Sequence, residues 1–369
     1  MTQFTGAFPA PAWTPPAREP FMPLRPLTLG QVLAGAFRGL RHNPGVTLAP
    51  ALVLSIAAAL LSAGFGLVVV APLVTATGSS ALGGGSYGWV SGFAAGAFGW
   101  LMQRALLQGA GTLQQGVASV DVAHAVVGRR LTPGGLRRRT RGVRGPLVAW
   151  TAIVVVATLL GGALAIGVMG LLALGGPAVA VLGGFLVYPG AAVAAAWLGT
   201  RAAFIPSVLV VERLRFGPGV RRGWRLTRGC FWRTFGTRLL AWAMIWLATS
   251  LVGIPVTMLV GWLTGIVAGN GAAGDGMLLG RIGELLAAVV TAVVAALGLV
   301  VTTSADAVLY LDTRMRREGL DLELARFLER RRPIVRFDPS EPDPYAPPAE
   351  LTAARVVAPA PPTTGPSWG

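Results

Sequence analysis

The sequence of 369 residues contains no lysine, a single cysteine and only two histidines. Without lysine the chain cannot carry the phosphate-binding loop that ends in Gly-Lys-Ser/Thr. Cys230 has no second cysteine with which to form an intrachain disulfide or a Cys-x-x-Cys metal pair. His42 and His124 are isolated, so no His-Glu-x-x-His motif is present. We therefore expect no catalytic residues, no metal and no cofactor.

Charged residues are also scarce, and apolar residues take their place. They make up 12% and 53% of the chain, and the mean hydropathy is +0.64, far above the range of soluble proteins. Six apolar runs are long enough to cross a bilayer as helices. These predicted spans are residues 46–74, 87–107, 146–174, 178–198, 239–267 and 285–310. The composition predicts an all-α polytopic membrane helix bundle with six transmembrane helices in three hairpins.

The arginines indicate how this bundle is oriented. All 31 basic residues are arginine, and the three loops after odd-numbered spans contain only one of them, Arg281. Basic residues accumulate in cytoplasmic loops near the ends of spans. We therefore expect a multi-pass protein of the cytoplasmic membrane with both termini in the cytoplasm. Because the arginines flank apolar spans rather than line a soluble module, we expect no nucleic-acid partner.

The two ends of the chain differ from the membrane domain, which is predicted at 27–311. Residues 1–26 contain seven prolines and residues 333–369 contain ten. Such segments cannot bury a core, and both are expected to be disordered. Between the sixth span and the tail, residues 312–332 alternate apolar and charged side chains and predict a cytoplasmic amphipathic helical segment.

Each pair of spans is preceded by a basic segment with helical apolar periodicity. In the first, Thr28 and Gln31 form a predicted capping box, and Pro44 marks the end of the helix. The others begin near Thr132 and Gly217. An apolar face with arginines beside it favours a helix on the surface of an anionic membrane. The predicted lipid-contacting residues are Arg38, Arg41, Arg137, Arg138, Arg221, Arg222, Trp224, Arg225 and Arg228.

Four charged residues are predicted at membrane depth or close to it: Arg104, Arg201, Glu212 and Asp306. Charges there are costly and are usually paired or functional. They could form an ionic cluster at the inner leaflet, with Asp306 facing Arg104 or Arg201. Alternatively, the two arginines extend to lipid phosphates and Asp306 caps a polar stretch near the interface.

Three segments, 25–45, 201–240 and 310–325, resemble uncharacterised bacterial multipass proteins that are labelled after the membrane domain of glycerophosphoryl diester phosphodiesterase. The resemblance implies a polytopic inner-membrane protein of undefined biochemical role. Phosphodiesterases of that name use a histidine pair and metal-binding carboxylates on a TIM barrel. This chain has neither the barrel nor the catalytic set.

We therefore expect a non-enzymatic membrane protein. It would have a structural or scaffolding role, or be an accessory of a membrane complex. Its expected partners are anionic lipids and another membrane or cytoplasmic protein. The alternative is a small-solute or lipid permease with its path near the proline-containing spans. The span midplanes are almost entirely alanine, valine, leucine and glycine, which favours the first interpretation because transporters usually carry polar ion-binding groups there.

The arginine asymmetry makes a direct prediction about topology. Reporter fusions after Gly83 and Ala272 should be external, and fusions after Thr140, Gly223 and Arg332 should be cytoplasmic. Paired alkaline phosphatase and fluorescent-protein fusions measure this. An external signal at Gly223 would contradict the six-span arrangement.

Overall fold

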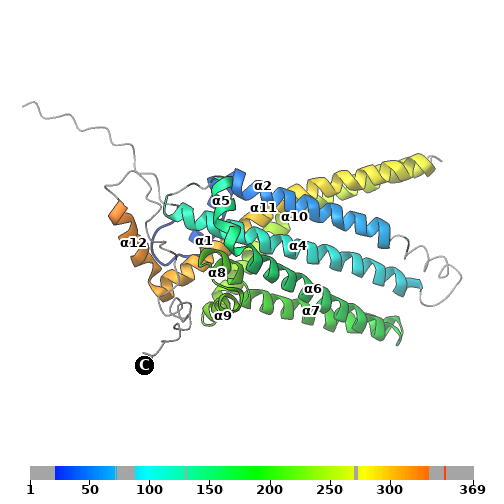
Figure 1. Ribbon diagram of the computed structural model, residues 1–369. Helices are drawn as coiled ribbons and strands as arrows, with labels where there is room; N and C mark the ends of the chain where they lie inside the picture. The colour runs from blue at the N-terminus through cyan, green and yellow to red at the C-terminus, as the bar shows by residue number, and fades with distance from the viewer. Residues whose placement is uncertain are drawn as a thin grey trace, which may run out of the picture.

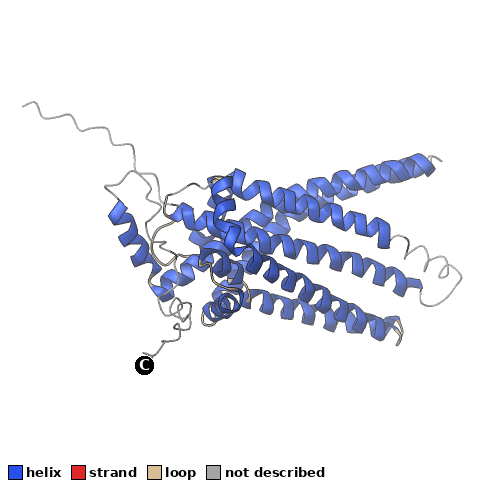
Figure 2. Cartoon of the chain, in the orientation of Figure 1, coloured by secondary structure: helices blue, strands red, loops and turns tan. Residues whose placement is uncertain are grey.

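The computed structural model describes residues 21–70, 72, 88–128, 130, 132–269, 273–331 and 345. The regular structure of this part of the chain is entirely helical, as Figure 2 shows. Its helices are α1 (Leu29–His42), α2 (Pro44–Phe65), η1 (Gly66–Val70), α4 (Gly88–Val126), α5 (Pro133–Thr140), η2 (Arg141–Val143), α6 (Arg144–Ala173), α7 (Pro177–Arg201), α8 (Ile205–Val211), α9 (Phe216–Thr227), α10 (Phe231–Gly269), α11 (Ala273–Glu318) and α12 (Leu320–Arg331). The predicted tails 1–26 and 333–369 lie largely outside the described residues.

Local sequence signals set several helix ends. The capping box that begins α1 is present, with the Thr28 side chain accepting from the Gln31 backbone and the Gln31 side chain accepting from the Thr28 backbone. Pro44 begins α2, where its missing N–H removes no helical hydrogen bond. Gly176, with φ of +100°, makes the turn between α6 and α7, which pack against each other as the predicted hairpin requires.

In the part of the chain that the structure describes, five helical stretches are long and apolar enough to cross a membrane. They are Pro44–Ser62, Pro133–Ala173, Ala178–Val211, Phe231–Leu263 and Ala287–Glu318. These overlap five of the six predicted spans, which confirms that the chain is an all-helical protein with several membrane-span-capable helices. The remaining predicted span, 87–107, falls in α4, whose side chains are described only from Gly96 onward.

Three of the helices are much longer than a span. α4 and α10 have 39 residues each and α11 has 46. At about 1.5 Å per residue they measure about 58 and 69 Å, against about 30 Å for the bilayer hydrocarbon. α11 is one uninterrupted helix that extends past residue 311, the predicted end of the membrane domain. It ends at Glu318, where Gly319, with φ of +65°, separates it from α12.

The ends of these long helices meet the short helices in one place. Figure 1 shows α1, α8, α9 and α12 gathered at one end of the molecule, with the long helices extending away from them. We call these four helices, together with the C-terminal turns of α4 and α11, the end module. Its apolar core joins all six elements through residues such as Val32, Val122, Val208, Leu309 and Leu324.

Burial changes sharply along the molecule. In the most apolar stretch of each helix, only 6% of the residues of α6, 6% of those of α7 and 0% of those of α10 are buried within the protein. The corresponding share for α11 is 44%. Leucine, valine and tryptophan side chains therefore point outward along the three peripheral helices. Large exposed apolar surfaces of this kind are expected where lipid replaces water.

Within the end module, the contact between α8 and α9 depends on a glycine. A Cβ at Gly223 would lie 2.9 Å from the backbone Cα of Ile205, and backbone atoms cannot move aside as a flexible side chain can. In contrast, nothing lies within 4 Å of a Cβ added at Gly217 of the same helix. The two positions form a matched pair.

We predict that Gly223→Ala lowers the free energy of unfolding by about 1 to 3 kcal/mol because the added methyl group forces α9 away from α8. Gly217→Ala should leave stability unchanged or raise it by less than about 1 kcal/mol, through helix propensity. Chemical denaturation in mixed micelles measures both. Equal effects would contradict close packing at Gly223.

Candidate functional site

A group of five polar side chains, four of them buried and Glu318 partly exposed, lies in the end module; we call it the charge cluster. Arg222 of α9 contacts Glu212 through Nε and Glu318 through Nη2, the latter at 2.9 Å. Arg314 of α11 pairs with Glu318 at 2.8 Å and approaches Glu212 at 3.9 Å. The Tyr310 hydroxyl donates to Glu212 at 2.7 Å. Two guanidinium groups thus face two carboxylates, and the cluster is electrically balanced.

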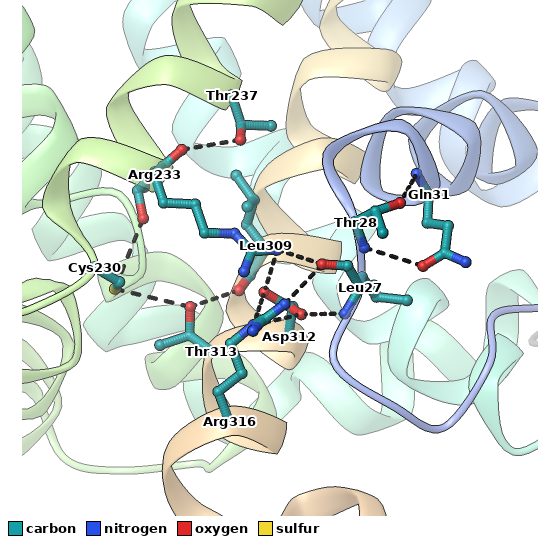
Figure 3. Close-up of polar contacts among 11 residues, drawn as sticks. Leu27, Thr28, Gln31, Cys230, Arg233, Thr237, Leu309, Asp312, Thr313 and Arg316 are labelled. Carbon is teal, nitrogen blue, oxygen red and sulfur yellow. Dashed lines mark hydrogen bonds and ion pairs between the residues drawn. The ribbon is translucent and has the colours of Figure 1, made fainter.

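A second polar group attaches the segment before α1 to the rest of the module, as Figure 3 shows. The backbone N–H of Leu27 donates to Asp312 at 2.7 Å. The Leu27 carbonyl accepts from Arg316 at 2.7 Å and from Arg233 at 2.5 Å. Both arginines also pair with Asp312 at 3.1 Å. One carboxylate therefore connects α10, α11 and the chain entering α1.

The four residues of the predicted ionic cluster are distributed among different contacts. Asp306 pairs with Arg238 of α10 at 3.5 Å, and Glu212 belongs to the charge cluster. Arg104 is exposed, with its guanidinium 5.8 Å from the ring centre of Trp100. Among the described residues, neither Arg104 nor Arg201 forms an ion pair with Asp306. Arginine over an aromatic ring near the end of a span is the arrangement expected of interfacial anchors.

The pairing of Asp306 with Arg238 follows from the register of the α10–α11 hairpin. α10 ends at Gly269 and α11 begins at Ala273, so the turn between them is centred near residue 271, and Arg238 and Asp306 are almost equally far from it along the chain. The predicted loop, between residues 267 and 285, is centred about five residues later. Two antiparallel helices place such residues at the same depth. Arg104 belongs to another hairpin, so its position in the sequence gave no reason to expect it beside Asp306.

The predicted lipid-contacting residues are only partly on the surface. Arg38, Arg41, Arg137, Arg221, Arg225 and Arg228 are exposed, and the side chain of Arg138 lies outside the described part of the chain. The prediction for Arg222 is wrong, because its side chain is only 5% exposed. It lies on the same face of α9 as Gly219, Gly223 and Leu226, all buried, and this face packs into the module.

The remaining side of α9 lies beside an aromatic cluster at the ends of α7 and α10. The half-buried ring of Trp224 meets Trp197 edge to face, with 6.3 Å between centroids. The Arg201 guanidinium lies 5.7 Å from the ring centre of Trp197 and 5.4 Å from that of Phe231. Trp232 is 79% exposed. Arginine and tryptophan with apolar bodies and polar tips are typical of the membrane interface.

Two buried carboxylates, Asp121 and Asp312, were not among the predicted site residues. Asp121 of α4 is 1% exposed and accepts a hydrogen bond from the Asn43 side chain at 3.2 Å. Desolvation raises its pKa above the ordinary value, and the Asn43 hydrogen bond and the charge of His42 oppose this shift. It lies far beyond the predicted end of span 87–107, and nothing in its local sequence marked it as buried.

Comparison with known proteins finds no matching protein family, no matching curated protein and no matching solved structure. The resemblance to multipass proteins labelled after the phosphodiesterase membrane domain therefore stays a prediction. Within the described residues, no three His, Cys, Asp or Glu side chains are grouped so as to hold a metal ion.

The Asp306 contact can be tested with a double-mutant cycle. Arg238→Gln should destabilise the protein because it leaves a buried carboxylate unpaired, and adding Asp306→Asn should restore part of the loss. We expect a coupling free energy of about 0.5 to 3 kcal/mol for this pair. The control cycle, Asp306→Asn with Arg104→Gln, should be additive within about 0.5 kcal/mol. Coupling only in the control cycle would contradict the pairing.

Proposed function

We propose that this chain is a six-span protein of the cytoplasmic membrane, with both termini in the cytoplasm, that acts as a non-enzymatic scaffold or as an accessory of a membrane complex. The five span-length apolar helices support the membrane assignment. The remaining span, predicted at 87–107, is assigned to the first half of α4. The orientation is supported by the placement of all but one arginine outside the loops that follow odd-numbered spans.

The observation that carries the scaffold proposal is the end module itself. The charges of the charge cluster neutralise one another, with Glu212 and the partly exposed Glu318 facing Arg222 and Arg314. These groups are engaged in holding three separate helices together, a structural use of ionic chemistry. A packed module attached directly to the ends of span helices presents a surface of fixed shape beside the membrane, which is what a scaffold requires.

The polar side chains on the C-terminal half of α4 have a similar role. Gln114 donates to the Thr47 carbonyl of α2 at 2.7 Å, and Gln115 donates to the Ala203 carbonyl before α8 at 2.5 Å. Ser119 and Ser207 share a hydrogen bond of 2.8 Å. Such contacts fix α4 against its neighbours, because buried polar groups are stable only when they are paired.

We further propose that the exposed side of α9 binds anionic lipid headgroups. Arg221, Arg225 and Arg228 are exposed there, and Trp224 lies beside the aromatic cluster. Each arginine near an anionic leaflet contributes about 1 kcal/mol, screened by salt. Because the opposite face of α9 is packed into the end module, lipid binding should be measured on the whole chain rather than on an isolated α9 peptide.

We predict that changing Arg221, Arg225 and Arg228 together to glutamine reduces the phosphatidylglycerol retained by the purified protein. The measurement is lipid extraction and mass spectrometry after exchange in mixed anionic and neutral micelles. Retention by the native chain should fall as salt rises, since headgroup attraction is screened.

The matched control removes three charges from the tail instead, at Arg332, Arg336 and Arg355. This variant should retain phosphatidylglycerol like the native chain. Equal losses in both variants would reduce the effect to net charge, and no loss in the α9 variant would contradict lipid binding at this surface.

A further inference from the structure

Tyr345 belongs to the proline-rich tail, and it is buried in the end module. The side chain is part of the module's apolar core, and the residue is 3% exposed. The phenol hydroxyl donates to the Ala123 carbonyl of α4 at 2.5 Å. The Tyr345 carbonyl accepts from Nη1 of Arg314, in the charge cluster, at 3.5 Å. A residue of the proline-rich tail is thus connected to both the core and the ion pairs.

The Ala123 carbonyl is a suitable acceptor for the Tyr345 hydroxyl. Ala123 lies in the last turn of α4, which ends at Val126. The final four carbonyls of a helix lack partners within the helix and need donors from elsewhere. A tyrosine supplies both a ring for an apolar pocket and a hydroxyl for the carbonyl at its end.

The surroundings of the ring form a pocket between two helices. Val120 and His124 of α4 and Val210 and Val211 of α8 line a small cavity beside Tyr345. The cavity volume is about 10 Å³, the space of roughly one water molecule. The residual space is therefore small. Arg213, whose backbone is in the left-handed region with φ of +52°, also lines the cavity.

We propose that the pocket between α4 and α8 is a binding site for a tyrosine-containing peptide segment, and that the chain's own tail occupies it through Tyr345. The sequence around the anchor, Asp-Pro-Tyr-Ala-Pro-Pro, contains three prolines in six residues. Prolines limit the conformations of the free segment, so less entropy is lost when it binds. The inference does not depend on the proposed scaffold function.

Covalent attachment makes this a strong intramolecular contact. A tethered segment has an effective concentration in the millimolar range. A separate protein carrying the same tyrosine chemistry would therefore have to displace the tail before it could bind. Tyr345 is then a built-in competitor for this pocket.

The single cysteine allows a direct test on the full chain. In a Cys230→Ser background, Ala349→Cys carries a nitroxide label beside the anchor. With Tyr345 present the spectrum should show restricted motion, and Tyr345→Ala should convert it to the fast motion of a free tail. Tyr345→Phe, which keeps the ring and loses only the hydroxyl, should be intermediate. Identical spectra for Tyr345 and Tyr345→Ala chains of equal helical content would overturn the proposal.

A second measurement examines the pocket from outside. A fluorescent peptide of residues 338–352 should bind the full-length Tyr345→Ala chain, and should bind the native chain at least about tenfold more weakly because the tail competes. The same peptide with alanine in place of tyrosine should bind neither chain. Equal affinity of both peptides for the Tyr345→Ala chain would show that the pocket does not recognise tyrosine, which would also overturn the proposal.

Discussion

The carboxylate of Glu212 lies between two guanidinium groups inside the protein, and the arrangement of the end module depends on this contact. Glu212 follows α8, Arg222 is on α9 and Arg314 is near the end of α11. Burying an isolated charge is strongly unfavourable, so none of these side chains can be buried unless the others are present. The ion pairs therefore require three helices, from distant parts of the sequence, to come together in one relative position. Tyr310 and Glu318 complete the set of partners on α11.

The length of the central helices explains how this charged module is joined to an apolar bundle. α11 carries both an apolar span and, in the same uninterrupted helix, three residues of the charge cluster and Asp312. Motion between span and module is thus limited by the stiffness of a helix rather than by a loop. The peripheral helices α6, α7 and α10 have most of their apolar surface outward, as expected of helices that face lipid.

Arginine has two distinct uses in this chain. Arg222 and Arg314 are buried and paired, and Arg233 and Arg316 hold the Leu27 carbonyl. Other arginines lie on the surface, and Arg201 rests against aromatic rings. The planar guanidinium group suits both uses, because it forms several directed hydrogen bonds and also stacks on aromatic faces. A chain without lysine can therefore meet structural and interfacial needs with one residue type.

The sequence by itself determined the helical class, the apolar spans, the turn at Gly176 and the capped start of α1. Each of these depends on composition or on residues within one or two helical turns, where local periodicity and capping decide the outcome. The sequence did not distinguish Arg222 from the exposed arginines beside it, nor did it pair Asp306 with Arg238 or mark Asp121 as buried. Only the tertiary structure decided these points, because the burial of a charge depends on which distant helix lies opposite it. For the same reason, the composition that predicted a disordered tail could not indicate that Tyr345 has a place in the core.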